Sequence, residues 1–137
     1  QEQIEAIGLF AEAIGVGFQI QDDLLNIAGE KFAAKIAVQG EDIPEGKRTL
    51  MVIPSFKHAA PEKAERLRTI LNEPPDDQAK IQEAIGIMRE TGSLEYPAGV
   101  ARDIVNKAWK EIESKFPDNE GRKKLKAFAS YLVDRDW

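Results

Sequence analysis

The chain contains no cysteine among its 137 residues. Disulfide bonds, thiol nucleophiles and zinc–thiolate sites are therefore excluded, and a reducing, cytoplasmic compartment is compatible with this composition. Apolar runs are short compared with the roughly 18 residues that a transmembrane helix needs, so we expect no membrane span. The net charge of −5 lacks the basic excess of a nucleic-acid-binding surface.

Basic residues are also missing from the first 30 positions, which carry six acids but no lysine or arginine. Two of these acids, Asp22 and Asp23, are adjacent within an otherwise apolar pattern. Burying a carboxylate pair without a counter-charge is costly, so a cation from outside the chain is expected beside it. The alternative is a solvated acidic patch or a pair of helix-capping acids, but caps belong at helix ends, whereas this pair lies within the pattern.

Strand patterns are lacking as well, because no run of residues alternates for long and the β-branched residues are scattered. Apolar residues recur at three- and four-residue steps from Ile4 to Ala28, which predicts a helix. We expect a single all-α domain, a helical bundle over residues 1–137. Further helices are predicted to begin near Arg48, Pro61, Gln78, Ser93 and Glu120.

Local signals predict several helix ends. Gly92 is expected to cap the helix over 78–90, and Ser93 to begin the next one. Pro54 is expected to end or kink the run that starts at Arg48. The last helix is expected to bury one apolar face, made of Leu125, Phe128, Ala129, Leu132 and Val133.

Oxygen-bearing side chains gather on one face of the first predicted helix. Gln19, Asp22 and Asn26 follow one another at three- and four-residue steps, and Asp23 lies one position further round. Carboxylate and amide oxygens are hard ligands that suit Mg²⁺. Phe18 adds a large apolar surface beside them.

A basic segment follows this acidic one. Residues 29–47 are predicted to form a loop, after which Gly46-Lys47-Arg48-Thr49 is expected to open a helix, a favourable place for a phosphate. The alternative is a solvated loop whose charges aid solubility, and the segment lacks the upstream glycine of a Walker A motif. Acids that hold a metal and cations that hold an anion together indicate a phosphorylated substrate.

Four segments carry a resemblance to a known family. Residues 18–26 (FQIQDDLLN) resemble the second aspartate-rich motif of the trans-isoprenyl diphosphate synthases, the farnesyl and geranylgeranyl diphosphate synthase family. Residues 41–50 (EDIPEGKRTL) resemble the loop that follows that motif. Residues 91–97 (TGSLEYP) and 128–137 (FASYLVDRDW) resemble the family's C-terminal segments, so the resemblance covers essentially the whole chain.

The resemblance implies a large all-α bundle, usually a homodimer, in which isopentenyl diphosphate condenses with an allylic diphosphate. Three Mg²⁺ ions promote ionisation of the allylic diphosphate in that family. By match to the motif, Asp22 is the main metal ligand with Asp23 in support, and Asn26 takes the place of the motif's third acid. Gln19 and Lys47 would face the allylic diphosphate, and Phe18 would lie near the isopentenyl group.

The chain departs from the family pattern in two further ways. The family usually has a lysine about five residues before the loop's Asp42, where this chain has Ala37 and Val38, and the nearest candidates are Lys35 and Lys31. Either the loop is longer and Lys35 takes the role, or that contact is lost. The first aspartate-rich motif is absent, so this chain alone is expected to be inactive as a prenyltransferase. The alternatives are a non-catalytic partner subunit of a prenyl diphosphate synthase and a helical interaction domain without catalysis.

Overall fold

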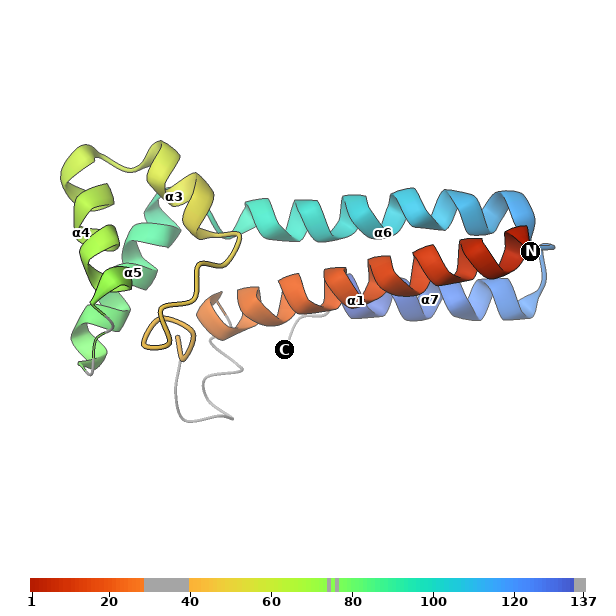
Figure 1. The fold of residues 1–137 in the computed structure, drawn as a ribbon, viewed down its shortest axis with the longest axis horizontal. Helices are drawn as coiled ribbons and strands as arrows, with labels where there is room; N and C mark the ends of the chain where they lie inside the picture. The colour runs from red at the N-terminus through yellow and green to blue at the C-terminus, as the bar shows by residue number, and fades with distance from the viewer. Residues whose placement is uncertain (29–39, 74, 76, 135–137) are drawn as a thin grey trace. The chain divides into compact units, whose positions relative to one another are not determined.

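The structure is a computed structural model that describes residues 1–28, 40–73, 75 and 77–134. Over these residues the chain forms six α-helices and no β-strand, which confirms the all-α prediction (Figure 1). The helices are α1 (Glu2–Ala28), α3 (Val52–His58), α4 (Pro61–Asn72), α5 (Gln78–Glu90), α6 (Glu95–Lys115) and α7 (Glu120–Asp134).

The chain divides into two compact units. The first joins Gln1–Gln21 to the described part of Ala98–Asp136, and the second comprises the described part of Asp22–Pro97. Each unit buries apolar side chains of its own. The expectation of one domain over residues 1–137 stays a prediction.

The first unit contains α1 as far as Gln21, α6 from Ala98 onward, and α7, and these helices run alongside one another (Figure 1). Its core holds Phe10 of α1 against Trp109 of α6, with ring centroids 5.4 Å apart. Ala129 and Val133 of α7 are buried in the same cluster. Burying a large apolar side chain contributes about 1.5–3 kcal/mol, so this cluster holds the three helices together.

Gly17 explains how closely these helices approach. A Cβ at this position would lie 3.0 Å from a methyl group of Val133 and 3.1 Å from one of Val105. The glycine therefore lets α1 pack on both neighbouring helices, as expected for a helix-interior glycine with a packing role. Gly8 and Gly15, in contrast, have nothing within 4 Å of an added Cβ in the described structure.

Several large apolar side chains remain exposed in the first unit. Ile4 and Leu9 of α1 are 72% and 58% exposed. Phe128 of α7 is 55% exposed, so its predicted place on the buried face of the last helix is wrong. Exposed apolar side chains that lie near one another are typical of surfaces that other protein elements cover.

α1 is the described helix that is long and apolar enough to cross a membrane, over Glu2–Ile27, by length and composition alone. The expectation that no stretch reaches this length therefore fails at α1. Core helices of globular proteins pass the same test, and Ala6 and Phe10 of α1 are buried against α6 and α7. One helix of this kind is weak evidence for a membrane span.

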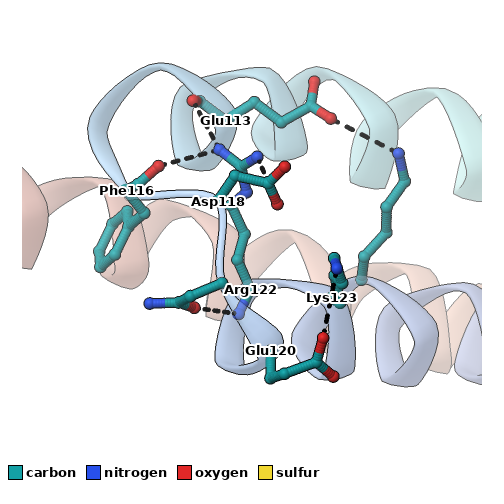
Figure 2. Close-up of polar contacts among 8 residues, drawn as sticks. Glu113, Phe116, Asp118, Glu120, Arg122 and Lys123 are labelled. Carbon is teal, nitrogen blue, oxygen red and sulfur yellow. Dashed lines mark hydrogen bonds and ion pairs between the residues drawn. The ribbon is translucent and has the colours of Figure 1, made fainter.

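Arg122 closes the turn between α6 and α7 (Figure 2). Its Nη1 donates hydrogen bonds to the backbone oxygens of Phe116, at 2.9 Å, and Glu113, at 3.2 Å. Its Nη2 forms an ion pair with Asp118 at 3.0 Å. The last carbonyls of a helix lack partners within that helix, and a cationic donor satisfies them well. The Asn119 side chain caps α7 by accepting the Arg122 backbone N–H at 3.0 Å.

We predict that Arg122→Ala lowers the free energy of unfolding by about 1–3 kcal/mol, because two backbone carbonyls lose a charged donor. Urea denaturation of the chain measures this change. Lys123→Ala is the matched control, since the Lys123 side chain pairs with Glu120 one turn away and is largely exposed. Equal stability of the two variants would show that Arg122 does not hold this turn.

The second unit contains a hairpin formed by α4 and α5. Arg66 donates two hydrogen bonds to the Glu83 carboxylate across the hairpin, at 2.8 and 2.7 Å. α5 begins where the Asp77 carboxylate accepts the Ala79 N–H at 2.9 Å. The observed helix, Gln78–Glu90, has the predicted boundaries.

The end of α5 confirms the predicted capping role of Gly92. Its φ is +65°, in the left-handed region that glycine adopts readily. The Gly92 N–H bonds to the Arg89 carbonyl, and the Ser93 N–H bonds to the Met88 carbonyl, each at 3.1 Å. This pair of bonds defines a Schellman motif.

Ser93 does not begin the next helix, which starts at Glu95. Its buried hydroxyl lies 2.8 Å from the Ser55 hydroxyl of α3 and 2.6 Å from that of Thr91. Ser55 also donates to the Met51 carbonyl at 2.8 Å. The predicted cap is therefore wrong, because the hydroxyl instead ties α3 to the end of α5.

The helix expected to open at Gly46–Thr49 begins instead at Val52. The Val52 N–H bonds to the Thr49 carbonyl at 3.0 Å, which forms a turn before the helix. Pro54 lies within the first turn of α3, where a backbone N–H has no helical partner to lose. Pro54 therefore does not end the helix, contrary to expectation.

Candidate functional site

The acidic pair lies on the last turns of α1. Asp22 is exposed and Asp23 is half-buried, whereas Leu24 and Leu25 are buried. Asn26 follows Asp22 by four residues, so the two side chains lie on the same face of the helix. The structure confirms the helix on which the predicted metal ligands stand.

Two further predicted site residues precede the pair on α1. Gln19 is exposed and Phe18 is half-buried. Both belong to the first unit, whereas Asp22, Asp23 and Asn26 belong to the second. Helical spacing alone puts Gln19 one turn before Asp22.

Asn26 connects the end of α1 to the loop that follows. Its side-chain oxygen accepts the Asp42 backbone N–H at 3.3 Å. Its backbone oxygen accepts the Gly40 N–H at 2.9 Å. The Asn26 side chain and backbone therefore fix the start of the loop at 40–46.

Any residue other than glycine at position 40 would strain the backbone. Its φ is +80°, and a Cβ there would lie 2.8 Å from Ile81 and 3.1 Å from Ile85. The backbone therefore passes directly over α5 while it bonds to Asn26. This close approach sets where the loop leaves α1.

Lys47 holds its ammonium group between two carboxylates. Its Nζ lies 2.5 Å from Asp42 Oδ1 and 2.8 Å from Glu45 Oε2. The hydrogen bond that Lys47 donates to Asp42, and then the one it donates to Glu45, raise the pKa of Lys47 well above its ordinary value. The lysine is therefore a permanent cation at any physiological pH.

Asp42 was not predicted as a site residue from the sequence. Its side chain is only 9% exposed, and its backbone oxygen accepts the Lys47 N–H at 3.0 Å. Asp42 thus contacts both Asn26 and Lys47. The sequence feature that could have identified Asp42 is its position five residues before Lys47, at the start of a loop that turns back on itself.

Other basic residues of the loop contribute differently. Arg48 donates to the Asn72 side chain at 2.5 Å, at the end of α4. Lys35 and Lys31, proposed for the missing family lysine, lie outside the described residues. Among the described residues of the loop, Lys47 is connected to the end of α1 through Asp42.

The described residues contain no cluster of three or more histidine or acidic side chains that could hold a metal ion by itself. The predicted ligands, Asp22, Asp23 and Asn26, supply two carboxylates and one amide. Such a small set is typical of Mg²⁺ sites that draw their remaining ligands from water and phosphate oxygens.

We predict that Gly40→Ala lowers the free energy of unfolding by about 1–3 kcal/mol, because the Cβ meets Ile81 and the φ is unfavourable. Gly86→Ala is the control, since an added Cβ there has nothing within 4 Å in the described structure. Urea denaturation compares the two. A Gly40→Ala variant as stable as the control would contradict the observed path of the loop.

Comparisons with known proteins first define the class. The chain matches all-α isoprenyl synthases among solved structures. A geranylgeranyl pyrophosphate synthetase from Pyrococcus horikoshii is similar, with a TM-score of 0.79 and 32% identity, over 99% of this chain and 41% of that one. A polyprenyl synthase from Caulobacter crescentus, complexed with calcium and isoprenyl diphosphate, gives a TM-score of 0.84 and 27% identity, over 97% and 40%.

Comparison of the amino-acid sequence identifies the family. The profile of the polyprenyl synthetase family matches residues 1–88, and the chain belongs to this family. A short chain isoprenyl diphosphate synthase from Methanothermobacter thermautotrophicus is 33% identical over 135 residues, which cover 98% of this chain and 40% of that protein. The chain thus spans about 40% of the length of such relatives.

Proposed function

We propose that this chain supplies one wall of the active site of a prenyl diphosphate synthase, which condenses isopentenyl diphosphate with an allylic diphosphate. The main support for this proposal is a pair of contacts: the Asn26 side chain accepts the Asp42 N–H, and the Asp42 carboxylate binds the Lys47 ammonium. They join the helix end that bears Asp22 and Asp23 to a permanent cation. Family membership and the shared fold support the same reaction.

Asp22 is the proposed main metal ligand, with Asp23 and Asn26 beside it. Asp22 is exposed at the end of α1 and shares a face with the amide oxygen of Asn26, so the donor set suits a hard, hydrated cation. A similar structure, a geranylgeranyl pyrophosphate synthase from Corynebacterium glutamicum, was solved with isoprenyl diphosphate and magnesium. When bound, Mg²⁺ would supply positive charge to the diphosphate leaving group.

The proposed role of the chain's own residues is to hold that leaving group. Lys47 places an ammonium group where negative charge develops as the bond to the allylic carbon breaks, and such preorganised charge lowers the barrier. Gln19 would donate to the same diphosphate, and Phe18 would line the isopentenyl side. The Asn26–Asp42 contact would keep the acids and Lys47 at a fixed separation.

The rest of the reaction needs the family's first aspartate-rich motif, which residues 1–137 do not contain. We therefore propose that the chain acts as part of a longer synthase. A homodimer is also proposed, supported by the exposed apolar side chains of α1 such as Ile4 and Leu9. The absence of cysteine fits the proposed cytoplasmic location.

We predict that Asp22→Ala, introduced into a full-length synthase that contains this chain, lowers kcat by about 10²–10³-fold, because one electrostatic contact to the transition state is lost. The rate is measured as the incorporation of labelled isopentenyl diphosphate into product that can be extracted into an organic solvent.

Asp103→Ala in α6 is the matched control, since it removes one exposed carboxylate far along the sequence and should leave kcat unchanged. A synthase that keeps its full kcat without Asp22 would exclude Asp22 from the site.

A further inference from the structure

The two carboxylates that bind Lys47 differ in how firmly they are held. The Asp42 side chain is 9% exposed, whereas the Glu45 side chain is 61% exposed. Both contact the same ammonium group, which is itself half-exposed. One partner is therefore built into the fold and the other lies at the surface.

Asp42 is fixed by its backbone as well as by its burial. Its N–H is held by Asn26 and its carbonyl by the N–H of Lys47. Removing Lys47 from Asp42 would leave a buried carboxylate without its counter-charge, which is costly. Asp42 therefore stays in place when a ligand arrives.

Glu45 can move at little cost. It lies in a turn, and an ion pair between two exposed side chains contributes little because water screens it. Lysine has three N–H donors, and Asp42 and Glu45 engage its ammonium in this structure. The fold, through Asp42, has already oriented the Lys47 ammonium. The place beside it that the Glu45 carboxylate takes can therefore accept another anion.

We propose that Glu45 occupies on Lys47 the place of a phosphate oxygen, so that diphosphate binds by displacing Glu45 while Asp42 keeps its contact. This inference rests on the proposed function of Lys47. With both carboxylates in place the group carries a net charge of −1, which repels a diphosphate. With Glu45 turned away, Lys47 and Asp42 are neutral together and an N–H donor becomes available. Glu45 thus sets the affinity of Lys47 for the diphosphate.

The test is the affinity for inorganic pyrophosphate, measured by NMR titration of the amide signals of residues 42–47 with Mg²⁺ in constant excess. We predict that Glu45→Gln binds about two- to five-fold more tightly than the wild-type chain, the gain expected from removing a weak surface competitor. Loss of a residue with a merely structural role would not strengthen binding.

Glu41→Gln is the matched control, because Glu41 lies in the same loop, is exposed and carries the same charge. It reports the general effect of removing one negative charge near the site. In a Lys47→Ala background, Glu45→Gln and Glu41→Gln should have equal effects, because the contact under test has gone.

The outcomes separate the two proposals. If the wild-type chain binds pyrophosphate and Lys47→Ala weakens binding, but Glu45→Gln gains no more than Glu41→Gln, the displacement of Glu45 is overturned and the proposed function stands. If Lys47→Ala does not change the affinity, the role of Lys47 in the proposed function is wrong, and the inference falls with it.

Discussion

The hydrogen bond from the Asp42 N–H to the Asn26 side chain is the constraint on which the candidate site depends. It joins the end of a long helix to a loop whose Asp42 orients Lys47. It holds the loop that carries Lys47 against the helix end that bears Asp22 and Asp23. Because Gly40 bonds to the backbone of the same asparagine and passes over α5, the connection is set by the packing of the second unit.

Opposite charges are arranged in this unit so that each group compensates another. The buried Asp42 is paired with Lys47, and the exposed Glu45 shares that cation. Asp22 and Asp23 lie nearby along the chain with no basic residue in the first 30 positions. We propose that a diphosphate with its divalent cation engages both segments, the cation at Asp22 and Asp23 and the diphosphate at Lys47 in the place of Glu45.

The sequence predicted what depends on neighbours along the chain. The period of apolar residues located α1 and α5, and Gly92 marked a helix end, because these features need only a few adjacent residues. Long-range contacts could not be predicted in this way. The partner of Ser93 is 38 residues away, and that of Asp42 is 16 residues away, so the cap at Ser93 was misassigned and Asp42 was overlooked.

The central claim is that one ligand bridges the end of α1 and the 40–47 loop. Paramagnetic broadening by Mn²⁺, which substitutes for Mg²⁺ at oxygen sites, tests it directly in the isotope-labelled chain. With pyrophosphate present, the account predicts that amide signals around Asp22 and around Lys47 broaden together, and that Asp22→Ala abolishes both effects. Broadening confined to one of the two segments, or unchanged in the Asp22 variant, would contradict the account.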